Sequence, residues 1–147
     1  MKILIDYIIK HQLLLTRWTG TFDLNDYEAS IQDFKKLWKK YKITRIIHNI
    51  SDLAYKEKDE DYNIETIMAA AKLRSLIPGS NYRVVFITNK PKDIVYTHLY
   101  AQELQLEENY KYCSTITKAQ ELLLIADPSL KLEKRFSYIK HNIKDLI

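Results

Sequence analysis

The chain has 147 residues, a formal net charge of +4, and a composition that is 46% hydrophobic and 29% charged. This length suits one domain with a substantial hydrophobic core, and the composition is ordinary for a globular protein. No apolar run approaches the length of a membrane span, so we expect no membrane insertion. The one cysteine, Cys113, excludes an internal disulfide framework and a cysteine-based zinc cluster, which favours a cytoplasmic protein.

The sequence contains two glycines, Gly20 and Gly79. A phosphate-binding P-loop or a dinucleotide fingerprint needs several closely spaced glycines, because the backbone must approach phosphate without a Cβ in the way. Neither motif can be drawn here. The sequence therefore predicts no nucleotide site, and we expect no cofactor.

The first predicted elements are a hairpin and a helix. Residues 2–9 and 13–20 are rich in strand formers and flank a short turn. A helix is predicted from Asn25, which can cap it, with Glu28 completing a capping box. Trp38 and Tyr41 continue its apolar stripe among several lysines. Because these aromatics should be buried, we do not expect them to stack on bases, and a nucleic-acid partner is not predicted.

The second half of the chain alternates strands and helices. Strands are predicted at 44–51, 82–89 and 111–114, and the helix before the second of these should close before Pro78 and Gly79. Helices from Pro91 and after Thr115 complete the pattern. The order β-β-α-β-α-β-α-β-α predicts an α/β fold with a single mixed, mostly parallel five-stranded sheet, in which only the opening hairpin is antiparallel.

Residues 127–147 are predicted to form a C-terminal amphipathic helical tail, following an α/β domain at residues 1–126. The tail can pack on its own sheet, pair with a second copy across a dimer, or lie on a membrane surface, in decreasing order of preference. If it is an interface, the apolar side chains that form it recur at spacings of four and three, and they are Leu132, Phe136, Ile139, Ile143 and Leu146.

The segment 56–66 carries five acidic residues and raises the question of a metal site. Asp59, Asp61 and Asn63 match the first, third and fifth positions of an EF-hand calcium loop. The sixth position, which requires glycine, is Ile64, and the twelfth lacks the required glutamate. We therefore expect no metal site. Asp61 and Asn63 are instead candidate helix caps, with Glu65 in the first turn of the helix.

Polar residues follow several predicted strands at their carboxyl ends, where open α/β sheets bind ligands. They form a candidate ligand site, although capping and turn formation would explain them equally well. His48 alternates with apolar Ile46 and Ile50, which favours a hydrogen-bonded interior histidine over a catalytic one. No nucleophile with an adjacent base can be assembled, so no catalytic residue is predicted. The candidate ligand-binding residues are Asp23, Asn49, Asp52, Asn89 and Lys90.

The order of elements resembles the STAS-like fold of anti-sigma-factor antagonists, in particular a bacterial branch of that superfamily. The resemblance covers residues 2 to about 126. It is carried by Gly20 at the end of the second strand and by four stretches of sequence, which are DLNDYEASI, IIHNISDL, RVVFIT and CSTITKAQELL.

The resemblance implies a switch that this chain lacks. In the antagonists, the loop after the third strand carries a serine whose phosphorylation controls partner binding. Asn49 occupies the position of their usual aspartate, and the next serine after Ser51 is Ser75. An acid in the place of the serine, such as Asp59, would be permanently charged.

These observations lead to three functional hypotheses. The first is a non-catalytic STAS-like regulatory or protein-interaction module without the phosphorylatable serine, binding a second copy as a homodimer or binding another protein. The alternative is a small-ligand binding or sensing domain that uses a cleft at the carboxyl ends of the strands. An enzyme using Asp52 or His48 ranks last, because no catalytic constellation supports it.

Overall fold

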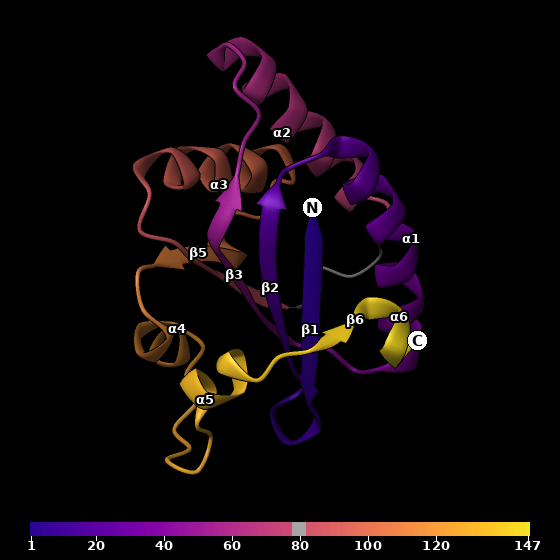
Figure 1. Ribbon diagram of the computed structural model, residues 1–147. Coiled ribbons are helices and arrows are strands. Elements are labelled where there is room, and N and C mark those ends of the chain that lie inside the picture. The colour runs from indigo at the N-terminus through magenta and orange to yellow at the C-terminus, as the bar shows by residue number, and fades with distance from the viewer. Residues whose placement is uncertain (78–81) are drawn as a thin grey trace.

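The computed structural model describes residues 1–77 and 82–147, and over these ranges it forms one six-stranded sheet with helices on both faces (Figure 1). The predicted helix stop at Pro78 and Gly79 lies outside the described residues. Short 3-10 turns, η1 (Ile9–His11) and η2 (Glu107–Asn109), precede the second and fifth strands. The strands and helices are β1 (Lys2–Ile8), β2 (Leu13–Thr21), α1 (Leu24–Lys40), β3 (Arg45–Ala54), α2 (Glu60–Arg74), β4 (Arg83–Ile87), α3 (Pro91–Glu103), β5 (Tyr110–Cys113), α4 (Ile116–Leu122), α5 (Leu132–Ser137), β6 (His141–Asn142) and α6 (Ile143–Leu146).

The strands follow the order β5-β4-β3-β2-β1-β6 across the sheet. β1 and β2 form an antiparallel hairpin, and β2, β3, β4 and β5 run parallel to one another. The predicted mixed, mostly parallel sheet is therefore confirmed. It has six strands where five were expected, because His141 and Asn142 pair with Ile5 and Leu4 at the outer edge of β1.

The central strands are buried on both faces. In β2, Leu14 packs into a first apolar cluster, whereas Leu13 and Leu15 pack into a second on the opposite face, and all three are 0% exposed. Helices α1, α2, α3 and α6 cover the first face, and α4 and α5 cover the second (Figure 1). This double burial explains why β2 is a continuous apolar run rather than an alternating one.

Helix α1 starts at a different cap from the expected one. Its N-cap is Asp23, whose carboxylate accepts a hydrogen bond from the Asp26 amide at 3.0 Å, rather than Asn25. Its apolar stripe packs on the sheet as predicted, with Tyr27 and Phe34 each 5% exposed. Over residues 1–77 and 82–147, no helix combines the length and apolarity that crossing a bilayer requires.

The tail is not the single amphipathic helix that its spacing suggested. It forms α5, then β6, then α6, and so passes round the β1 edge of the sheet from the second face to the first (Figure 1). The strand interrupts the helical pattern, because pairing with β1 satisfies backbone groups that the open sheet edge would leave exposed.

The tail side chains expected at an interface are used in the chain's own core. Helix α5 and the segment after it pack into the second cluster, α6 packs into the first, and Leu146 is partly buried against the first. The tail therefore packs on its own sheet, and it presents no continuous apolar stripe to a second chain. The four buried members are Leu132, Phe136, Ile139 and Ile143, which are 3% to 8% exposed.

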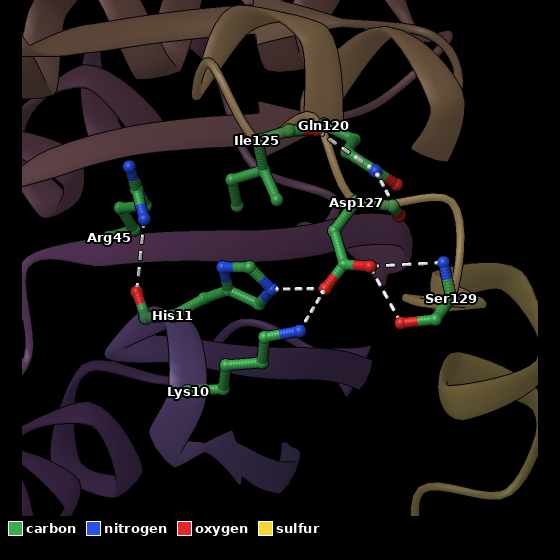
Figure 2. A network of polar contacts seen from close by, with 7 residues as sticks. All are labelled: Lys10, His11, Arg45, Gln120, Ile125, Asp127 and Ser129. Carbon is green, nitrogen blue, oxygen red and sulfur yellow. Dashed lines mark hydrogen bonds and ion pairs between the residues drawn. The ribbon is translucent and has the colours of Figure 1, made fainter.

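A polar network joins the start of the tail to the hairpin (Figure 2). The Asp127 carboxylate lies 2.7 Å from Nε2 of His11 and 3.2 Å from Nζ of Lys10, and it accepts a bond from the Ser129 hydroxyl at 2.6 Å. The hydrogen bonds from Ser129 and His11 hold the pKa of Asp127 well below its usual range. The Gln120 amide adds a bond to the Asp127 carbonyl, so the network fixes where the tail begins.

We expect Phe136→Ala to lower the free energy of unfolding by about 3–5 kcal/mol, because the side chain is 4% exposed and its removal leaves a cavity in the second cluster. Urea unfolding measures the loss. Tyr138→Ala is the matched control: its side chain is 65% exposed, and the change should stay within about 0.5 kcal/mol. Equal effects in the two variants would contradict the assignment of the tail to the core.

Candidate functional site

Asp23 and Asp52, at the carboxyl ends of β2 and β3, both have local partners. Asp23 caps α1 and forms an ion pair with Lys56 at 3.0 Å. The Asp26 amide and Lys56 together lower the pKa of Asp23. Asp52 forms an exposed ion pair with Arg17, also at 3.0 Å. These carboxylates serve capping and pairing rather than a common pocket.

Lys90 bridges two loops. Its ammonium group donates to the Leu53 carbonyl and lies 3.7 Å from the Asp93 carboxylate, which is 1% exposed. The Thr88 hydroxyl donates to the same carboxylate at 2.5 Å. Burial raises the pKa of Asp93, and the Thr88 and Lys90 contacts oppose that rise. This cluster holds the start of α3 against β3.

The remaining two predicted ligand residues have no contacts that indicate a ligand-binding site. Asn49 accepts a bond from the Ser51 amide at 3.2 Å, and Asn89 is exposed. The structure thus does not bring the five predicted residues into one pocket. Of the five, Asp23 lines a cleft that is described below.

The acidic segment mostly forms the start of α2. Asp59 is the N-cap, and its carboxylate accepts a bond from the Tyr62 amide at 2.8 Å. Asp61 lies in the first turn, not at the cap as expected, and the predicted cap Asn63 is buried within the helix. Because the helix begins at Glu60, Glu65 falls in the second turn. No group of three or more His, Cys, Asp or Glu side chains is placed to hold a metal ion in the described ranges.

A surface cleft opens between α1 and α2 at the carboxyl ends of β2 and β3. Its volume is about 460 Å³. Asp23 and Asn25 line one side, and Tyr62 and Glu65 line the other. The cleft lies at the edge of the sheet where a ligand site was expected, although it is built mainly from helix residues that the strand pattern did not indicate.

A second, internal cavity of about 80 Å³ lies under α1, α2 and α3, against the first face of the sheet. Most of its lining is aromatic or aliphatic, and the polar exceptions include His48 and Arg74. The wall nearest the surface cleft is shared by both spaces and consists of Phe22, Tyr55 and Ile67.

His48 belongs to a buried hydrogen-bonded chain. Trp18 Nε1 donates to the Thr16 hydroxyl at 2.8 Å, and that hydroxyl lies 2.6 Å from Nδ1 of His48. Burial, with the Arg74 charge adding, lowers the pKa of His48 to about 3. The imidazole is therefore neutral near pH 7.

His48 lines the cavity and keeps an intermediate accessible area. Tyr100 has the same combination and hydrogen-bonds Tyr27 through the two hydroxyls at 2.6 Å. An interior histidine was expected from the strand alternation.

Arg74 was missed at the sequence level. It is 7% exposed and follows Ile67 and Ala71 at spacings of four and three, so it continues the buried face of α2. That spacing was the available signal. An arginine at a helix end is usually read as a solvated partner of the helix dipole, which hides this signal.

We expect the protein to lose stability between about pH 7 and about pH 4, partly through His48. Its folded pKa lies below the unfolded value of 6.5, so the unfolded state binds the extra proton and stability falls as the pH drops through this window. The contribution amounts to about 3 kcal/mol over two to three pH units. Urea unfolding at several pH values measures it. His48→Gln should show a shallower pH slope, and an equal slope would contradict the buried neutral imidazole.

Comparison with known proteins identifies the fold. No protein-family model and no curated protein sequence matches the chain. The solved structure of the anti-sigma factor antagonist SpoIIAA in its unphosphorylated form matches with a TM-score of 0.50 at 12% identity, covering 85% of this chain and 99% of that one. The phosphorylated form of SpoIIAA, a Bacillus cell fate determinant, gives a TM-score of 0.43 at 15% identity, covering 82% and 97%. The chain therefore has the STAS-like fold of the anti-sigma factor antagonists.

Proposed function

We propose that the chain is a non-catalytic regulatory module of the cytoplasm that acts by binding another protein. The main support is the likeness of its fold to that of SpoIIAA, an anti-sigma factor antagonist, over 85% of the chain. The chain lacks a glycine-rich phosphate loop, and no metal-ligand cluster occurs among the described residues. A binding role is therefore better supported than a catalytic one.

The module works without a phosphoserine switch in this proposal. Residues 52–74, which span the loop after β3 and the whole of α2, contain no serine. The N-cap of α2 is Asp59, an acidic residue where a switch would need a phosphorylatable one. The surface at this helix end is constitutively acidic rather than switched on by a modification.

The partner-binding surface in this proposal is the acidic rim, defined here as Glu57, Asp59, Glu60, Asp61 and Tyr62. All five side chains are exposed, and Tyr62 is a large aromatic group that is 40% exposed. Tyrosine is enriched at protein interfaces and among their binding anchors. The rim therefore suits a protein partner with a basic surface.

We expect the double variant Glu57→Lys and Asp61→Lys to lose its partner, because it reverses charge at the rim and leaves the Asp59 cap intact. Chemical crosslinking in cells, followed by mass spectrometry, identifies the retained protein and the contact residues. Glu107→Lys with Glu108→Lys, also exposed but at η2, is the matched control and should retain the partner. Retention by both double variants, or crosslinks away from the rim, would contradict the proposal.

A second copy of this chain is the alternative partner. The mass of the protein in solution distinguishes the two, since a homodimer has twice the mass of the 17.5 kDa chain. A homodimer in which the rim contacts a basic patch of the second copy would be weakened by the same charge reversal.

The second candidate function is small-ligand binding or sensing. The observation that favours it is the cleft of about 460 Å³ at the carboxyl ends of β2 and β3. Open α/β sheets bind ligands at this edge, and the cleft shares part of its wall with the cavity under α1, α2 and α3.

A further inference from the structure

The tail carries positive charge that the chain does not pair internally. Exposed lysines follow its course from α5, past β6, to α6, and others lie at the end of α1, beside which α6 packs (Figure 1). We call these side chains the basic belt. They are Lys131, Lys134, Lys140, Lys144, Lys40 and Lys42. None of the six forms an ion pair with a carboxylate in the described ranges, so the belt can bind an external anion.

The acidic residues of the tail and of β1 already have partners within the chain. Asp127 is held by the network of Figure 2, and Asp6 forms an ion pair with Arg135 at 3.0 Å. Asp145 accepts a bond from a backbone amide at 2.8 Å in the capping box of α6. Glu133 accepts a bond from a hydroxyl on α4 at 3.5 Å. The end of α1, residues 34–42, contains no acid. The belt therefore keeps its net positive charge.

An exposed aromatic ring lies among these lysines. Tyr138 ends α5 with 65% of its surface exposed, and it follows Lys134 by four residues, which places both on one side of the helix. The tyrosine borders a surface cleft of about 330 Å³ that Lys131, Lys134 and His141 also line. A cavity of about 150 Å³ holds a benzene ring, so this cleft has room for a larger flat ring beside Tyr138.

Lysines beside an exposed aromatic ring are the combination that binds single-stranded nucleic acid, because the cations contact phosphates and the ring stacks on an unpaired base. The sequence argued against such a partner, since Trp38 and Tyr41 belong to the apolar stripe of α1. The structure agrees for these two, which pack against the first cluster. Tyr138 is different, because it projects from the tail outside both clusters.

The course of the belt favours a flexible strand over a membrane surface. The tail passes round the β1 edge from the second face of the sheet to the first, and the belt follows it (Figure 1). A planar bilayer cannot contact both faces at once, whereas a single strand can bend round the edge. The apolar side chains between the lysines, Ile139 and Ile143, are buried, so they offer no apolar face for insertion into lipid.

We propose that the basic belt binds single-stranded nucleic acid through its phosphates, with one base stacked on Tyr138 in the cleft beside α5. Lysine–phosphate contacts carry no sequence information and every base has a π-face, so the binding is independent of base sequence. The belt follows the β1 edge, whereas the acidic rim lies at the start of α2. The proposal therefore does not rest on the protein partner of the rim.

Fluorescence anisotropy tests the proposal. The probe is a fluorescein-labelled oligo(U) of about ten nucleotides, titrated with the full-length protein. We expect saturable binding with a Kd between about 1 and 100 µM at physiological salt. The logarithm of the association constant should fall with the logarithm of the salt concentration at a slope of about −3 to −4, which corresponds to about four to six phosphate contacts. An abasic strand of the same length should bind at least about fivefold more weakly, because it cannot stack.

Three variants assign the binding to the belt and the ring. Lys131→Gln with Lys134→Gln should weaken binding about tenfold and make the salt slope shallower by about 1.4, because two phosphate contacts are lost. Tyr138→Ala should weaken it at least about fivefold with an unchanged slope, and Tyr138→Phe should bind as the wild type does. The matched control removes two exposed lysines away from the belt, Lys58→Gln with Lys111→Gln, and should bind normally. Circular dichroism verifies folding of these surface variants.

Several results would overturn the inference. They are the absence of saturable binding, equal affinity for oligo(U) and the abasic strand, an unchanged salt slope in the Lys131 and Lys134 variant, and an equal loss in the control. Vesicles that contain phosphatidylserine provide the remaining comparison. Binding to these vesicles without binding to oligo(U) would identify a membrane surface as the partner and contradict the proposal. Oligo(dT) of the same length shows whether the strand is RNA or DNA, and saturable binding of either supports it.

Discussion

The structure depends above all on the burial of its central strands on both faces. Leu13, Leu14 and Leu15 are all fully buried, so β2 must have a helical layer above and below it. Helices α1, α2 and α3 provide one layer. On the other face α4 alone is only two turns long, and the tail completes the cover through α5. The polar network at Asp127 and the pairing of β6 with β1 are the means by which the tail is held there.

The first face combines this apolar layer with polar groups that apolar packing would not require. Thr16, His48 and Arg74 are enclosed under α1 to α3 among aromatic rings. Hydrogen bonds orient all three side chains. The bond from Trp18 to Thr16 orients Thr16 and, through it, His48, and the bond to Tyr82 orients Arg74. Buried polar groups lower stability unless they are satisfied. These polar groups lie around one cavity, next to the surface cleft between α1 and α2.

The sequence predicted the helices and strands more reliably than the site. Strong alternation and helical spacing identified the hairpin, α1 and the strand at 83–87, because local backbone preference and burial agree there. The candidate ligand residues were chosen because they follow strands. In the structure they have local roles: Asp23 caps a helix, and Lys90 hydrogen-bonds a neighbouring loop. Arg74 could have been found from its place on the buried face of α2. The cavity itself could not, since it arises where three helices meet the sheet without filling the space between them.

The sequence by itself determined the alternation of strands and helices, the mostly parallel sheet, the interior position of His48 and the absence of a glycine-rich phosphate loop. These follow from local spacing and residue type, which act over a few neighbours along the chain. The tertiary structure alone decided that residues 132–146 divide into two helices and a strand, because the open edge of β1 competes with helix formation for the same backbone hydrogen bonds. It also decided that Arg74 faces a cavity without a carboxylate, since that depends on which side chains α1, α3 and β3 bring to it from distant parts of the chain.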